Sequence, residues 1–144
     1  RRRFGYRRIG LMLEREGMVW SGHEIEAIEW FEAARRFGIA ARWGTWHDFG
    51  IAYYLADRYQ DAVMIELEGA NRQANDWITP LILAAAYVQL GNAEQAADAV
   101  RDLLRLRPFF SIEQWASQFP DPDDAAHMVI GLETAGLGKS IEEE

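Results

Sequence analysis

The feature that most constrains the fold is an internal repeat, because the sequence resembles itself when it is shifted by 34 residues. The shift aligns Tyr53 with Tyr87 and small residues with small residues. The two aligned segments are 50–62, Gly-Ile-Ala-Tyr-Tyr-Leu-Ala-Asp-Arg-Tyr-Gln-Asp-Ala, and 84–96, Ala-Ala-Ala-Tyr-Val-Gln-Leu-Gly-Asn-Ala-Glu-Gln-Ala. Repeats with a period of about 20–50 residues are typical of stacked units that bury one continuous core. The repeat therefore predicts two helix–turn–helix pairs.

Small residues mark where the two helices of each pair are expected to touch. Gly91 would supply a turn residue with positive φ, and Asn92 with Gln95 would cap the following helix. Pro108 would end that helix. The small residues at the expected contacts are Gly50, Ala62, Ala84 and Ala96.

The order of Trp, a large apolar residue, a small residue, Tyr, a turn, Tyr and Ala resembles the tetratricopeptide (TPR) signature. Asp57 stands where that signature has Gly, and Pro80 stands where it has Trp. After Ala62 the register is expected to slip by one residue, with Leu67 and Ala70 one place late. The matching residues are Trp46, Phe49, Gly50, Tyr53, Tyr59 and Ala62 in the first repeat and Leu83, Ala84, Tyr87, Gly91, Ala96 and Pro108 in the second.

The resemblance implies an all-α fold, a TPR-like antiparallel helix-pair solenoid (an α-α superhelix) closed by C-terminal capping helices. By this resemblance, residues 19–42 would form a half repeat, 43–108 two full repeats, 109–138 the capping helices and 139–144 a disordered tail. In the half repeat, Ser21-Gly-His-Glu24 predicts a capping box for a helix that runs to about Phe37.

Two further helix starts are expected in the capping region. Ser111 would cap a short helix that contains Trp115, and Asp121 would cap a last helix with Pro122 at its first position. Either Gly136 or Gly138 would end it. This arrangement resembles the C-terminal end of bacterial TPR regions attached to adenylate-cyclase-like or transcription-regulator proteins.

Residues 1–18 differ from the rest, because six Arg and two Glu give them a charge of +4 while the remainder carries −12 of the net −8. They resemble the first helix of the helix-turn-helix segment of insertion-sequence transposases. The resemblance implies a transposase-like N-terminal helix joined to a TPR piece, in a chain that is a fragment of a longer bacterial protein. Nucleic-acid contacts would come from Arg1, Arg2, Arg3, Arg7 and Arg8. The acidic remainder argues against nucleic acid as the main partner.

The sequence does not predict an enzyme. The absence of Cys excludes a disulfide framework and a thiolate site, and no phosphate-binding or nucleophile-elbow motif occurs. His47 is expected to cap a helix or line a groove, His127 to lie at the surface, and His23 to lie at a helix start among acids. The six Trp are expected in the core. No catalytic residue, metal or cofactor is predicted.

The predicted function is therefore a cytoplasmic protein–protein interaction scaffold that binds a protein or peptide, with self-association included and no membrane contact. Its groove would be apolar and uncharged, and Tyr54→Ala or Val88→Glu would weaken binding without unfolding the chain. The alternative is a nucleic-acid-associated remnant of a transposase fusion. The groove residues implied by the TPR resemblance are His47, Ile51, Tyr54, Leu55, Leu81, Ala85, Val88 and Gln89.

Overall fold

The computed structural model describes residues 21–37, 46–70 and 76–138, and these form helices and turns with no strand among them. The all-α fold class is thus confirmed for this part of the chain. The predictions for residues 1–18 and 139–144 lie outside it. The helices are α2 (Glu24–Arg36), α4 (Trp46–Leu55), α5 (Tyr59–Ala70), α6 (Ile78–Gln89), α7 (Ala93–Leu106), α8 (Ile112–Ala116) and α9 (Pro122–Thr134).

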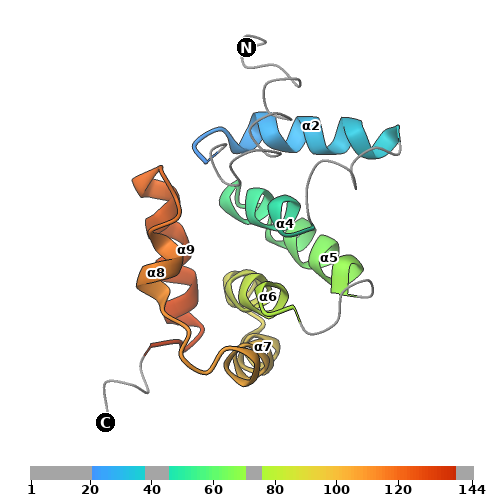
Figure 1. The fold of residues 1–144 in the computed structure, drawn as a ribbon. Helices are drawn as coiled ribbons and strands as arrows, with labels where there is room; N and C mark the ends of the chain where they lie inside the picture. Colours follow the sequence, from blue (N-terminus) through green and yellow to red (C-terminus); the bar gives the residue numbers. More distant parts are fainter. Residues whose placement is uncertain (1–20, 38–45, 71–75, 139–144) are drawn as a thin grey trace.

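The helices follow one another in a stack, with α2 at one end, the pair α4 and α5 in the middle, and the pair α6 and α7 at the other end (Figure 1). Helix α2 packs on α4, α5 packs on α6, and α4 also reaches α6. Helices α8 and α9 lie together across one side of this stack (Figure 1). None of the described helices is both long and apolar enough to cross a membrane.

The turns inside the two helix pairs have the same hydrogen bonds. Arg58 N–H donates to the carbonyl of Tyr53 at 2.8 Å, and 34 residues later Asn92 N–H donates to the carbonyl of Tyr87 at 2.9 Å. The residue before each donor has a positive φ, 65° at Asp57 and 82° at Gly91. Asp can replace Gly here because its short side chain tolerates the left-handed region better than most. The two predicted helix–turn–helix pairs are thus present, and Gly91 has the positive φ predicted for it.

The four small residues predicted at helix contacts are all buried. At Gly50 the contact is close, because a Cβ added there would lie 2.1 Å from Oε2 of Glu66. The missing side chain of Gly50 therefore leaves room on α4 for the side chain of Glu66, which extends from α5.

The predicted register slip in α5 is wrong. Glu66 is fully buried and Gly69 is buried against Trp46, whereas the apolar Leu67 is 46% exposed. Helix α5 thus keeps a regular spacing from Ala62 onward, and a carboxylate occupies a position where an apolar side chain is expected.

The predicted caps of α8 and α9 are confirmed. Ser111 Oγ accepts from Gln114 N–H at 3.1 Å, and Asp121 Oδ1 accepts from Asp123 N–H at 2.8 Å. Pro122 follows at the first helical position. Because these bonds satisfy orphan N–H groups, both helices begin where the sequence places them.

Two other predicted caps are wrong. Helix α2 begins at Glu24 after His23, with no side-chain cap bond, because the hydroxyl of Ser21 is turned toward α9 instead. Asn92 does precede α7, but its side chain makes no cap bond.

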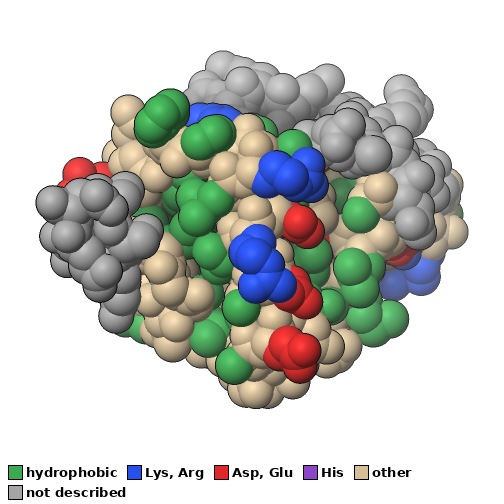
Figure 2. All heavy atoms as spheres, turned by 90° about the horizontal axis from the view of Figure 1, so that it is seen from below, with side chains coloured by type: hydrophobic (Ala, Val, Ile, Leu, Met, Phe, Trp, Pro, Cys, Tyr) green, Lys and Arg blue, Asp and Glu red, His purple; other side chains and the backbone are tan. Residues whose placement is uncertain are grey.

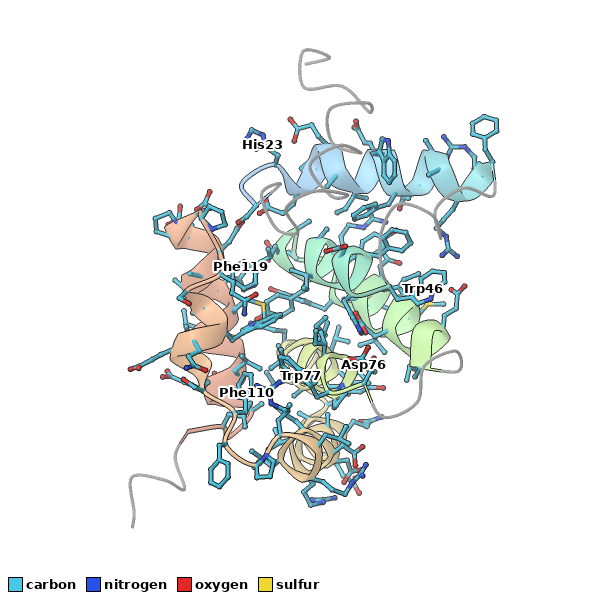
Figure 3. The ribbon with its side chains drawn as sticks, in the orientation of Figure 1. His23, Trp46, Asp76, Trp77, Phe110 and Phe119 are labelled. Atoms are coloured by element: carbon cyan, nitrogen blue, oxygen red, sulfur yellow. The ribbon has the colours of Figure 1, made fainter. Side chains whose placement is uncertain are left out.

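Aromatic residues attach α8 to the stack. The ring of Trp77 lies 5.9 Å from that of Phe110 and 6.0 Å from that of Trp115, which is 5.6 Å from Phe119 (centroid distances). Figure 3 shows Trp77 and Phe110 beside each other between α6 and the segment that leads to α8. Trp30 and Trp115 are buried, and Trp46 and Trp77 are partly buried against the core. The described Trp residues thus pack as predicted.

Candidate functional site

The eight predicted groove residues lie on α4 and α6, which pack against each other. We call this surface of α4 and α6 the inner face. His47 and Val88 are half-buried, and Gln89 is exposed. Because Tyr54 is 0% exposed, we expect Tyr54→Ala to destabilise the fold itself, contrary to the sequence analysis. The five groove residues that are buried are Ile51, Tyr54, Leu55, Leu81 and Ala85.

Helix α9 covers the inner face. It packs mainly on α6 and also touches α4. The hydroxyl of Tyr54 donates to the backbone carbonyl of His127 at 2.9 Å and accepts from Nε2 of Gln89 at 3.1 Å. Burial raises the pKa of Tyr54 to about 12. The phenol therefore stays protonated at neutral pH and keeps its proton available for the carbonyl of α9.

The closest approach between α9 and the inner face is at Gly131. A Cβ added to Gly131 would lie 2.1 Å from the hydroxyl oxygen of Tyr54 and 3.3 Å from Cβ of Ala85. Real Cβ atoms do not come within 3.0 Å of such neighbours. Glycine inside a helix costs about 1 kcal/mol relative to alanine, so its presence here needs a packing reason. The Tyr54 hydroxyl is that reason.

His127 lies in an aromatic cluster and not at the open surface, so its predicted position is wrong. Its ring is 4.5 Å from the ring of Tyr54, and its side chain is 23% exposed. The Tyr59 hydroxyl lies 3.0 Å from His127 Nε2 and donates to Oδ1 of Asp57 at 2.9 Å. This cluster joins the middle of α9 to the turn between α4 and α5.

The start of α9 is held to the start of α2 by Asp124. One oxygen of Asp124, Oδ2, accepts from the hydroxyl of Ser21 at 2.6 Å and from Gly22 N–H at 2.9 Å. Burial and a hydrogen bond with Asp124 raise the pKa of Glu24 to about 7. The carboxyl of Glu24 therefore keeps its proton at mildly acidic pH. We call Ser21, Gly22, Glu24 and Asp124 the carboxyl latch.

We expect Asp124→Ala to lower the free energy of unfolding by about 2 kcal/mol, because it leaves the buried hydroxyl of Ser21 without its acceptor and the carboxyl of Glu24 without its partner. Gly22 N–H keeps its other acceptor, Oε2 of Glu24 at 2.8 Å. Asp123→Ala is the matched control, since Asp123 also lies in the first turn of α9 but is exposed. Both substitutions remove a carboxylate from the positive end of the helix dipole, which contributes about 0.3–1 kcal/mol. Urea unfolding curves compare them, and equal losses would contradict a specific latch.

A second polar cluster lies at the start of α4, around His47. His47 Nδ1 is 3.3 Å from Oε1 of Glu66, and His47 Nε2 is 2.5 Å from Oδ2 of Asp76. The other oxygen of Asp76 accepts from Ile78 N–H at 3.0 Å at the start of α6. His47 therefore links α4, α5 and α6, whereas the sequence suggested a cap or a groove residue. Among the residues that the structure describes, no three His, Asp or Glu side chains are grouped to hold a metal ion.

Burial and the neighbouring charges together set the pKa values of this cluster. Burial alone would lower the pKa of His47, but Glu66 and then Asp76 overcome that effect and raise it to about 9. Burial raises the pKa of Glu66 to about 7, although His47 opposes this shift. Oε2 of Glu66 has no hydrogen-bond partner. A buried carboxylate with one oxygen unsatisfied is tolerated here because His47 supplies a positive charge.

The outer surface along α7 carries charged side chains, unlike the apolar inner face. Arg101 pairs with Asp98 and Arg105 with Asp102, so charges of both signs run along α7 between apolar side chains (Figure 2).

A hollow of about 860 Å³ lies on the α8 and α9 side, and one of about 320 Å³ lies between α6 and α7. The larger one is lined by Phe109, Phe110, Ser111, Ile112, Glu113, Ala116, Ser117, Val129, Glu133, Leu137 and Gly138.

The predicted nucleic-acid contacts Arg1, Arg2, Arg3, Arg7 and Arg8 lie outside the described residues. Sequence reasoning predicted the last helix but missed that it covers the inner face, although Gly131 between the apolar Ile130 and Leu132 was a signal of close packing. Comparison of the chain with protein-family models gives no match, and comparison with curated proteins gives none either.

Proposed function

We propose that this chain is a protein–protein interaction module whose inner face binds a helix of a partner in the position that α9 occupies. The observation that carries the proposal is α9 itself, which lies across α4 and α6 with its backbone hydrogen-bonded to Tyr54. Helix-in-groove recognition uses an apolar stripe on the ligand helix. A face that holds one helix in this way has the shape and chemistry to hold another.

A TPR-like solenoid is the architecture that best accounts for this face. The two helix pairs share one turn geometry at a spacing of 34 residues, and their helices pack in chain order. In such stacks the first helix of each pair lines one side, which here means α4 and α6. This arrangement supports a scaffold that presents an extended surface for binding a protein segment.

In the isolated chain, α9 competes with any partner for the inner face. A tethered helix acts at an effective concentration on the order of millimolar, so a free helix must bind tightly to displace it. The proposal therefore predicts weak binding by the unaltered chain and stronger binding once α9 is dislodged.

A peptide of residues 121–138 tests this directly. We expect the labelled peptide to bind the Gly131→Leu chain at least tenfold more tightly than the unaltered chain, because the leucine cannot fit beside Tyr54 and frees the face. Fluorescence anisotropy gives the affinities, and circular dichroism checks that the variant remains helical. Ala126→Leu is the matched control, since Ala126 is an exposed position of the same helix.

Asp124→Ala provides an independent way to loosen α9, because it acts at the latch and leaves the inner face unaltered. It should also increase peptide binding. If both folded variants bind the peptide no better than the unaltered chain does, the inner face is not a helix-binding site.

A further inference from the structure

The way Gly131 fits against Tyr54 identifies the kind of helix that the inner face accepts. We infer that this face selects partner helices with a glycine opposite Tyr54, flanked by a large apolar residue three positions before it and another directly after it. The inference rests on the proposed function. It adds a specificity rule that the proposed function alone does not contain.

The glycine requirement follows from distance. A Cβ at position 131 would lie 2.1 Å from the Tyr54 hydroxyl oxygen and 3.2 Å from its ring carbon Cζ. Tyr54 cannot easily move away, because it is 0% exposed and its hydroxyl is bonded to both His127 and Gln89. Even alanine would therefore have to push the whole ligand helix outward.

The hydrogen bond to α9 depends on the same glycine. The carbonyl of His127 lies four residues before Gly131, so in a regular helix it already accepts the N–H of Gly131. A second donor must approach that carbonyl from the side, over the position that the side chain of residue 131 would cover. The absent side chain thus opens a path for the Tyr54 hydroxyl. The glycine and the tyrosine form one recognition unit.

The flanking positions carry the apolar part of the contact. Met128 and Leu132 are 1% and 0% exposed, and both belong to the core cluster that contains Tyr54. They lie three positions before and one position after Gly131, which places all three on one side of a helix. By contrast, Ile130 is 58% exposed. The face therefore recognises the residue pattern large-x-x-Gly-large. It does not contact the side chain directly before the glycine strongly enough to select it.

The decisive experiment measures peptide selectivity with the Gly131→Leu chain as host, since its own helix is displaced. We expect the peptide of residues 121–138 to lose at least tenfold in affinity when its glycine at position 131 becomes alanine. This loss would run against intrinsic helix propensity, which favours the alanine peptide by about 1 kcal/mol. A peptide with Ile130→Ala should bind within threefold of the unaltered one.

A second host, Gly131→Leu with Tyr54→Phe, shows whether Tyr54 is the cause. Removing the hydroxyl should reduce the alanine penalty to less than threefold. Equal binding of the glycine and alanine peptides to the first host would overturn the inference while leaving helix binding intact. A full penalty in the second host would overturn the assignment to Tyr54. If no peptide bound either folded host, the proposed function itself would fail.

Discussion

Replacing His47 with leucine is expected to lower the free energy of unfolding by about 3 kcal/mol near pH 7, because it leaves the carboxyl of Glu66 buried without a cation. The side chain of Glu66 is 0% exposed, and that of His47 is 13% exposed. A carboxyl group in this position must either stay charged in an apolar setting or take up a proton, and both cost free energy. Chemical denaturation followed by tryptophan fluorescence measures the loss.

The matched control is a surface ion pair between α2 and α5, the helix that also carries Glu66. Arg35 and Glu68 are 3.4 Å apart with side chains that are 37% and 40% exposed, so Arg35→Ala should cost no more than about 0.5 kcal/mol. The double variant His47→Leu with Glu66→Met should recover most of the stability, since an apolar pair needs no charge compensation. A His47→Leu chain as stable as the Arg35→Ala chain would show that the buried pair is not needed.

The helix pairs could be predicted from sequence because their signals are local. Apolar spacing, the aligned tyrosines and the turn at Gly91 all lie within one repeat, and each reports on a contact between neighbouring helices. The caps at Ser111 and Asp121 follow from hydrogen bonds across two or three residues. Local agreement of this kind explains why α7, α8 and α9 begin close to their predicted positions, and why α7 and α9 also end close to theirs.

The covering of the inner face by α9 could not be predicted, because it depends on contacts between residues far apart in the chain. Tyr54 and Gly131 meet only when α9 crosses the stack. Gly131 signals a close contact, but neither local segment indicates which residue makes it. Ser21 shows the same limit. Its sequence context resembles a helix cap, yet its hydroxyl binds Asp124, which lies 103 residues away.

Glu66 shows a different limit of sequence-based prediction, which comes from assuming that a charged residue is exposed to water. A glutamate in an amphipathic helix is normally assigned to the water side, and the neighbouring Leu67 to the core. The structure reverses the two, because His47 supplies the opposite charge and Gly50 supplies the space. His47 and Gly50 both lie on α4, the preceding helix. The sequence signal for a buried Glu66 was therefore on α4 and not on α5.

The same buried groups make stability depend on pH in one direction. The folded-state pKa of His47, about 9, is above its ordinary value of 6.5, so the folded chain binds more protons than the unfolded chain between these values. The stabilisation is complete below pH 6.5 and is lost as the pH rises through about 9. The pKa of Glu66 and that of Glu24 are both raised to about 7, so their protonated forms favour the folded state in the same way at lower pH.

We therefore expect the free energy of unfolding to fall steadily from about pH 5 to about pH 9, with His47 contributing on the order of 2 kcal/mol above pH 6.5. Urea unfolding at half-unit pH steps measures the profile. His47→Leu should flatten it mainly above pH 6.5. Glu24→Gln should flatten it mainly below pH 7. Arg35→Ala is the control, since an arginine stays charged throughout and should shift the curve without changing its slope.

The two variants also separate the roles of the two clusters. Glu24 lies in the carboxyl latch at the start of α9, so loss of its proton near pH 7 places two negative charges side by side where α2 meets α9. Peptide binding to the inner face should then increase between pH 6 and pH 8 in the unaltered chain, and Glu24→Gln should abolish that increase. His47→Leu should change overall stability yet leave this pH-dependent binding in place. If His47→Leu abolished the increase and Glu24→Gln did not, release of α9 would have to originate in the His47 cluster.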